Sequence, residues 1–200
     1  MASTSPITIC SNALLMLGSK PIASFDEAAA PANLDRARLC ANLYPMVKLS
    51  VLRRHPWNCA IRRVQLSPDA TAPAFGFQYR YALPGDWLRT LAVGASDYDR
   101  ITYRSEGRFL LSDEPIFPLV YLADVAESDM DAMLVEIMTL AMAEVLAYPI
   151  TASTSVQDAQ YQKLRMAMKQ AGAVDGQDDP PETLGDFRLL GARLGGGFGS

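Results

Sequence analysis

The chain has 200 residues, of which 50% are hydrophobic and 20% charged, with a formal net charge of −4 and a pI near 5.0. This length suits one domain with a sizeable core, and the composition excludes an intrinsically disordered chain. The acidic balance argues against attraction of the whole surface to nucleic acid, although a local contact with DNA stays open.

The first helix is predicted from its cap. Ser5 precedes Pro6 at the first helical position, and apolar residues then recur at helical spacing until Gly18. A loop follows, and a second, longer helix carries an apolar stripe through Leu39, Leu43, Val47 and Val51. Pro45 lies inside this helix and cannot donate to the carbonyl of Ala41, so we expect a kink there or a split into two helices.

From Trp57 onward the hydrophobic period changes from helical to alternating. Short apolar runs separated by turn residues predict strands, and Glu106 with Gly107 indicates a hairpin between two of them. Aromatic and polar residues alternate over 75–83, which is typical of a strand with one buried face. The expected strands start at Ile61 and then cover residues 75–83, 88–93, 101–104, 108–111 and 116–122.

Helical sequence returns near Ser128 and Asp129, which we expect to cap a helix so apolar that it must be buried on most sides. A further helix is predicted from about Ser155 to Gly172. We therefore expect an α+β fold. Residues 1–56 and 125–174 form a bundle of about four helices, residues 57–124 an inserted antiparallel β module, and residues 175–200 a flexible, extended docking tail.

The tail has a glycine-rich composition with scattered anchors. Aromatic, aliphatic and arginine side chains in such a segment are typical of a chain that orders on a partner. The docking candidates are Phe187, Arg188, Leu190 and Arg193.

Residues 44–63 contain the only histidine and allow two interpretations. His55 and Cys59 are four residues apart, the spacing of neighbours on a helix, and a thiolate beside an imidazole is a nucleophile. Pro56 lies between them and disfavours a continuing helix, so we favour a structural joint between helices and sheet. The joint residues are Pro45, Pro56 and Trp57.

Metal, redox and membrane roles are not expected. Cys10, Cys40 and Cys59 are widely spaced, and with one histidine they form neither a disulfide framework nor a zinc site. We therefore expect reduced thiols, no metal and no cofactor. The N-terminal residues lack a basic segment followed by an apolar run, and we expect no apolar stretch of about eighteen residues, hence no secretion and no membrane span.

Two further sets of charged residues leave alternatives open. Glu136 and Glu144 fall on one face of the apolar helix, where burial would raise their pKa, and paired carboxylates serve glycoside hydrolysis. Arg53, Arg54 and the pair Arg62 and Arg63 form a basic cluster that could meet DNA or a neighbouring subunit. A polysaccharide hydrolase and a DNA-binding helical module are thus the alternative functions.

The order of several short motifs, from residue 5 to about 175, resembles the tail tubular protein A family of short-tailed phages. Where that family has a WNFA-like element, this chain has Cys59 in place of the Phe. The matching motifs are ICSNAL at 9–14, LG at 17–18, PI at 21–22, ANLYP at 41–45, LRRHPWNCA at 52–60, FGF at 75–77, YALPGDWLR at 81–89, EGR at 106–108, LL at 110–111 and Tyr121.

The resemblance implies a structural virion protein rather than an enzyme. Members of such a family act as head-to-tail adaptors that form a ring, expected to hold twelve copies, between the portal protein and the tail nozzle. The ring would line the path of double-stranded DNA without sequence specificity, and no membrane would be involved. The chain would be made in the host cytoplasm and reside at the head–tail interface of the virion.

Overall fold

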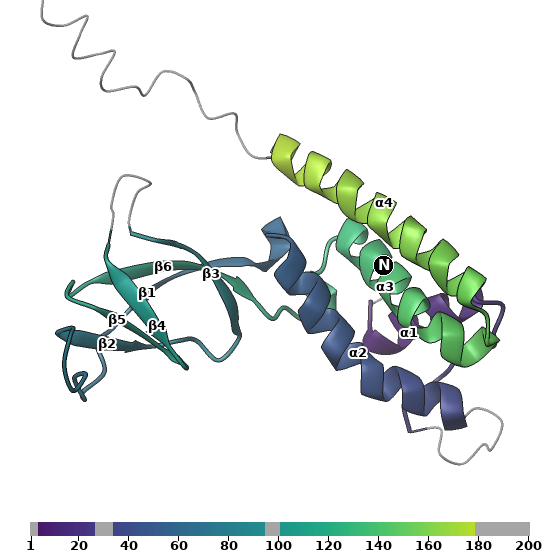
Figure 1. Ribbon diagram of the computed structural model, residues 1–200, viewed down its shortest axis with the longest axis horizontal. Helices are drawn as coiled ribbons and strands as arrows, with labels where there is room; N and C mark the ends of the chain where they lie inside the picture. The colour runs from purple at the N-terminus through teal and green to yellow at the C-terminus, as the bar shows by residue number, and fades with distance from the viewer. Residues whose placement is uncertain (1–3, 27–33, 95–100, 179–200) are drawn as a thin grey trace, which may run out of the picture.

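A computed structural model describes residues 4–26, 34–94 and 101–178 of the chain, and it confirms the α+β class. Four α-helices and six strands are described, and they are separated in space as well as in sequence (Figure 1). The strands, which we call the β region (residues 61–123), lie at one end of the molecule. The helices α1 to α4, which we call the helical region, lie at the other end.

The first two helices follow their local signals only in part. α1 (Pro6–Met16) is capped as expected, because the Ser5 hydroxyl accepts a hydrogen bond from the Thr8 N–H, and Gly18 follows with φ +71°. α2 (Leu34–Arg54) runs unbroken through Pro45, so the expected split into two helices is wrong. Pro45 lies on the exposed side, whereas the buried stripe packs against α3 and holds the helix together on both sides of the proline.

α3 (Ala132–Thr151) is the central helix. The other three helices all pack against it, and half of its 20 residues are buried, so it is the buried central helix that the composition predicted. Its cap is Asp131, whose carboxylate accepts from the Leu134 N–H at 2.7 Å, and not Ser128 or Asp129. Those two residues lie in the short 3-10 turn η2 (Glu127–Asp129), which precedes α3.

α4 (Thr154–Asp178) is longer than expected. It continues past Gly172 and past residue 174, where the sequence indicated the start of a tail. Single glycines are tolerated in a helix at a cost of about 1 kcal/mol, and the first proline after the helix is Pro180. The expected docking residues of the tail lie outside the described residues.

The six strands form two three-stranded antiparallel sheets, sheet A with the order β1-β6-β3 and sheet B with the order β2-β5-β4. The tight turn between β4 and β5 confirms the predicted hairpin, with Gly107 at φ +58°. The strands are β1 (Ile61–Leu66), β2 (Tyr79–Ala82), β3 (Trp87–Val93), β4 (Tyr103–Glu106), β5 (Phe109–Ser112) and β6 (Phe117–Ala123).

The alternating aromatic segment is only partly a strand. β2 starts at Tyr79, and the four residues before it form a bend in which Gly76 has φ +89°. Phe75 therefore points into solvent with 88% of its surface exposed, instead of into the core. The core of the β region lies between the sheets, where the Tyr81 ring stacks on Phe117 with centroids 4.8 Å apart.

Candidate functional site

The segment between α2 and β1 joins the two regions. Trp57 is fully buried there, and its indole N–H donates to the Val51 carbonyl at 3.2 Å. The His55 ring meets the Trp57 ring edge-on, with centroids 4.7 Å apart. Pro56 is exposed at the corner, and the 3-10 turn η1 (Asn58–Ala60) leads directly into β1. The buried Trp57 side chain thus folds back onto the end of α2, directly before the chain enters β1.

A charged cluster fastens the other crossing between the regions. The Lys48 ammonium lies 2.9 Å from Asp124 and 3.2 Å from Glu127, and the Tyr44 hydroxyl donates to Glu127 at 2.9 Å. Tyr44 and Lys48 are one helical turn apart on α2, while their partners follow β6. We call these four residues the crossing cluster. The spacing of Tyr44 and Lys48 places them on one face of a helix, which the sequence could predict. No local pattern predicts that this face meets residues about eighty positions later.

The electrostatics of the crossing cluster favour an ionised Glu127. Burial alone would raise the pKa of the Glu127 carboxyl, but hydrogen bonds from its backbone N–H and from Tyr44, together with Lys48, outweigh burial and lower the pKa. Burial and the hydrogen bond to Glu127 raise the pKa of the Tyr44 phenol. At neutral pH the ionised Glu127 carboxylate and the neutral Tyr44 phenol are therefore in contact, beside Lys48.

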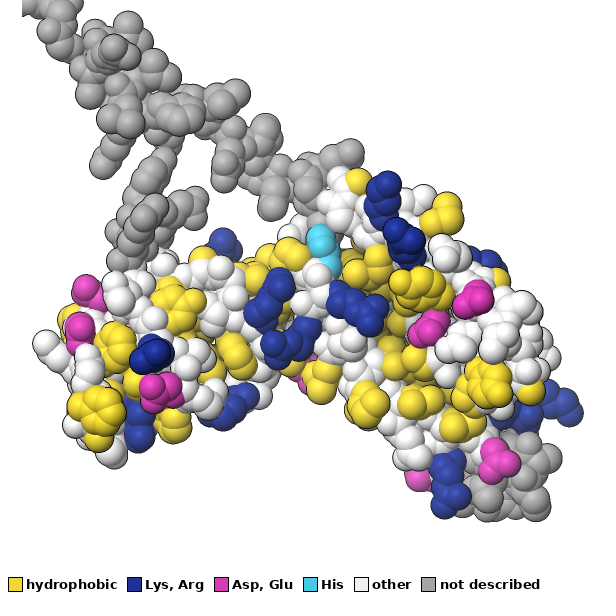
Figure 2. Space-filling model, viewed as in Figure 1, with side chains coloured by type: hydrophobic (Ala, Val, Ile, Leu, Met, Phe, Trp, Pro, Cys, Tyr) yellow, Lys and Arg dark blue, Asp and Glu magenta, His cyan; other side chains and the backbone are white. Residues whose placement is uncertain are grey.

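The four candidate contact arginines do not share one face. Arg53 donates to the Leu88 carbonyl of β3 at 2.8 Å, and Arg62 donates to the Cys59 carbonyl at 2.9 Å. Arg62 and Arg63 are adjacent on β1 and so point to opposite faces of sheet A. Arg54 and Arg63 are exposed. Lys and Arg side chains gather over the junction in Figure 2, but two of these four have backbone carbonyls as partners.

The Cys–His interpretation finds no activated thiol. Burial raises the pKa of the Cys59 thiol, which disfavours the reactive thiolate. Cys10 and Cys40 are fully buried, and a hydrogen bond between them, together with burial, raises the pKa of Cys10. All three cysteines are free thiols.

The two candidate acids on α3 lie far apart along the helix axis. Eight residues of α-helix separate Glu136 from Glu144, which corresponds to about 12 Å along the axis. Paired glycosidase carboxylates lie only about 5–9.5 Å apart. Glu136 is exposed rather than forced into the core, and Glu144 is half-buried and accepts from Gln157 at 3.4 Å.

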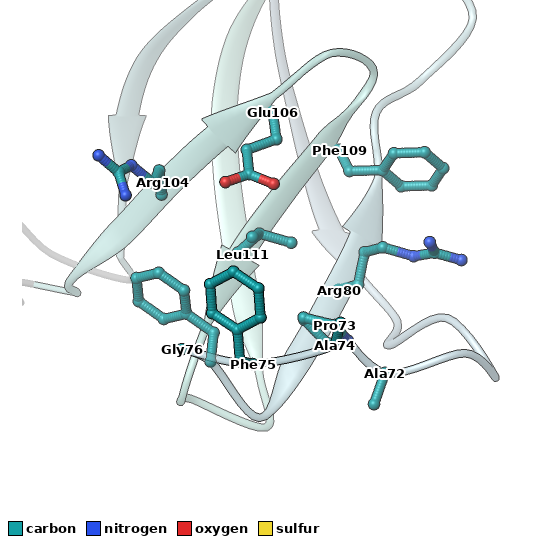
Figure 3. Close-up of a pocket in the computed structure, with 11 residues that line it drawn as sticks. Ala72, Pro73, Ala74, Phe75, Gly76, Arg80, Arg104, Glu106, Phe109 and Leu111 are labelled. Carbon is teal, nitrogen blue, oxygen red and sulfur yellow. The ribbon is translucent and has the colours of Figure 1, made fainter.

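A shallow bowl opens on the outer face of sheet B (Figure 3). Tyr81 points inward to Phe117, so its neighbour Arg80 faces outward together with residues of β4 and β5. Arg80 lies over the Phe109 ring at 4.4 Å and pairs with Asp69 at 2.9 Å. The bowl encloses about 450 Å³, and residues 72–77, which we call the aromatic loop, form its rim.

A second hollow lies in the helical region between α2 and α4, and we call it the helical groove. It encloses about 190 Å³ and has Ala141 and Glu144 of α3 among its lining residues. Its other lining residues are Met46, Val47, Ser50, Val51 and Arg54 of α2 and Leu164 of α4. The groove leaves no local pattern in the sequence, because it depends on how far apart α3 holds its two neighbours.

The described residues offer no metal cluster, but they include one helix that is apolar enough to span a membrane. Among residues 4–26, 34–94 and 101–178, no group of three or more His, Cys, Asp or Glu side chains could hold a metal ion. α3 is long and apolar enough to cross a membrane by length and composition, with a mean hydropathy of 1.6 over an 18-residue stretch, so the expected absence of such a stretch was wrong. In the structure 56% of that stretch is buried, as the central helix of a packed region requires.

Comparisons with known proteins add no family assignment. Neither a scan against protein-family models nor a search of curated proteins finds a match to this chain.

Proposed function

We propose that this chain is a structural virion protein, a ring-forming head-to-tail adaptor that joins the portal to the tail nozzle and lines the DNA ejection channel. The proposal starts from the motif order that resembles the tail tubular protein A family. Its strongest structural support is the braced junction between the helical and β regions, since a connector must transmit position between two partners.

Three separate contacts brace that junction. Trp57 fills the core at one crossing, Arg53 reaches from α2 to the Leu88 carbonyl, and Lys48 holds Asp124 at the other crossing. The Arg53 and Lys48 contacts join α2 to the β region or to the chain that leaves it. The buried Trp57 indole, bonded to the Val51 carbonyl of α2, fixes the turn that leads into β1. An adaptor subunit needs such a fixed angle, because a small change in angle at each subunit would prevent a ring from closing.

In this proposal the two ends of the molecule have different partners. The helices act as a bundle that forms the wedge of a ring, with twelve copies expected. The β region contacts neighbouring subunits or the nozzle. The C-terminal residues act as a flexible tail that docks on the portal through Phe187, Arg188, Leu190 and Arg193. Arg54 and Arg63 are exposed and available to passing DNA or to a neighbour.

The role is structural rather than catalytic. The separation of Glu136 from Glu144 and the raised pKa of the Cys59 thiol both weigh against the hydrolase alternatives. The split orientation of Arg62 and Arg63 weighs against a specific DNA-binding module. The expected place of action is the head–tail interface of the virion, after synthesis in the host cytoplasm.

The docking proposal is tested by removing the tail without disturbing α4. A chain that ends at Asp178 should lose binding to the portal protein of the same phage, measured by mass photometry of the mixture. A full-length chain with Phe187, Arg188, Leu190 and Arg193 all replaced by Ala should lose it as well. Replacing only the exposed Glu136 by Gln is the matched control and should leave binding unchanged. Unchanged binding by the shortened chain would exclude the tail as the portal anchor.

A further inference from the structure

The aromatic loop projects an apolar knob from the β region. Its six residues, Ala72-Pro73-Ala74-Phe75-Gly76-Phe77, carry no charge, and Phe75 at its tip is 88% exposed. A phenylalanine ring with that exposure buries almost no apolar surface in its own chain, so it contributes little to the stability of the fold. The loop before β2 lies at the end of the β region that is farthest from the helices (Figure 1).

The helical groove offers an apolar surface at the other end of the molecule. Its apolar wall is formed by Met46, Val47, Val51 and Leu164, and Met46 at its edge is 67% exposed. A volume of about 190 Å³ is small for a cofactor or drug-sized ligand, whose sites measure about 300–1,000 Å³. The groove therefore suits a single large side chain offered by another protein surface.

Charges beside the knob and the groove match in pairs. Arg104 and Glu106 come from β4 and line the same bowl as Phe75 (Figure 3), and the side chain of neither makes an ion pair or hydrogen bond within the described residues. At the groove, Arg54 makes no such contact within the described chain either, and Glu144 accepts only the long bond from Gln157. Each apolar surface thus carries one cation and one carboxylate that could pair across a contact.

We infer that the aromatic loop of one copy of this chain docks in the helical groove of a second copy, with Phe75 between Met46 and Leu164. Glu106 then meets Arg54, and Arg104 meets Glu144. Knob and groove lie on opposite regions of the molecule (Figure 1), so one copy cannot make this contact with itself. The contact is head-to-tail, which produces a ring when the rotation closes and a filament when it does not.

This inference rests on the proposed function, because it names the subunit contact that the adaptor ring needs. The direct test replaces Phe75 by a photoreactive phenylalanine analogue in the full chain. Mixing isotope-labelled and unlabelled chains separates contacts between copies from contacts within one. We expect cross-links between copies to the peptides that contain Met46 to Val51 or Leu164, either in the free protein or in the protein bound to the portal. Cross-links only to other segments, or none under both conditions, would overturn the inference.

Variants test the same contact without a probe. Phe75→Ala should weaken association between copies at least tenfold by sedimentation velocity, in solution or on the portal. Ile116→Ala is the matched control, because Ile116 is 56% exposed on the β region but lines neither hollow. Arg54→Glu should also weaken association, and adding Glu106→Arg should restore it. Equal association of the Phe75→Ala variant and the parent would overturn the inference.

The outcomes separate the inference from the adaptor proposal. A portal complex without a link from position 75 to the groove would leave the adaptor role standing and remove this contact. A link from position 75 to the groove without any portal binding would support the contact and remove the adaptor role.

Discussion

The helical and β regions differ in how each obtains its core. The helical region is built around α3, which is buried against three other helices along its length. The β region has two small sheets whose shared interior depends on a few large side chains, chiefly Tyr81, Leu110, Phe117 and Leu119. The helices thus form a scaffold around one central helix. The thinner β region leaves Phe75, Arg104 and Glu106 exposed.

The junction shows what this difference requires. A thin β region holds a fixed position only when its link to the scaffold is stiff. Buried indole packing at one crossing and the ionised crossing cluster at the other provide that link. Substitutions at the link and in the cores should therefore separate the contributions of the helical and β regions to stability.

Removing the indole at the junction should have the largest effect. Trp57→Ala leaves a cavity and deprives the Val51 carbonyl of its donor, so we expect a loss of about 4–5 kcal/mol in the free energy of unfolding. Trp57→Phe keeps most of the volume and should cost clearly less. Denaturant unfolding followed by circular dichroism measures both. A Trp57→Ala variant as stable as the parent would refute the joint.

Phe117→Ala should destabilise the β region and leave the helical region folded. It removes the ring that stacks on Tyr81, at an expected cost of about 3–4 kcal/mol that falls on the β region. Hydrogen exchange should then show loss of amide protection in residues 61–123 and retained protection in α3. Equal loss of protection in both would mean that the regions unfold as one unit.

The crossing cluster should make stability depend on pH. The pKa of Glu127 is lowered in the folded state, so its contribution is present above the ordinary carboxyl pKa of about 4.3 and is lost as pH falls through the lower folded value. Glu127→Gln should therefore cost about 1–2 kcal/mol at pH 7 and progressively less below pH 4. Thermal unfolding of both proteins across that range is the measurement. A difference that stays constant down to pH 3 would contradict the ionised cluster.

Arg53→Ala should have the smallest effect. It removes one hydrogen bond from an exposed guanidinium to the Leu88 carbonyl, with an expected cost of about 1 kcal/mol. Arg54→Ala is the neighbouring control, and it should change the free energy of unfolding by less than about 0.5 kcal/mol. A larger loss of stability in the Arg54→Ala variant than in the Arg53→Ala variant would contradict the bracing role of Arg53.

Local chemistry explains what the sequence predicted well. Ser5 before Pro6, the apolar run of α3 and the Glu106–Gly107 turn each act within a few residues, and each appears in the structure as expected. At Pro45 the split into two helices was wrong, since packing against α3 keeps α2 continuous despite the lost hydrogen bond. Phe75 was misjudged as well, because alternating aromatics read as a strand while Gly76 with φ +89° bends the chain out of the sheet.

The long-range features of the fold were the least predictable. The crossing cluster joins α2 to residues about eighty positions away, and the helical groove depends on the spacing of three helices. Neither leaves a periodic or short-range pattern. By contrast, the basic residues near the junction were visible in the sequence, but their division between carbonyl partners and solvent required the fold.

The most direct test of the adaptor role is the mass of the assembly. The purified chain is measured alone and then mixed with the portal protein of the same phage. We predict a discrete complex in which the portal carries a ring of this chain, with a mass that corresponds to about one copy per portal subunit. No complex at micromolar concentrations, with both proteins folded, would contradict the account.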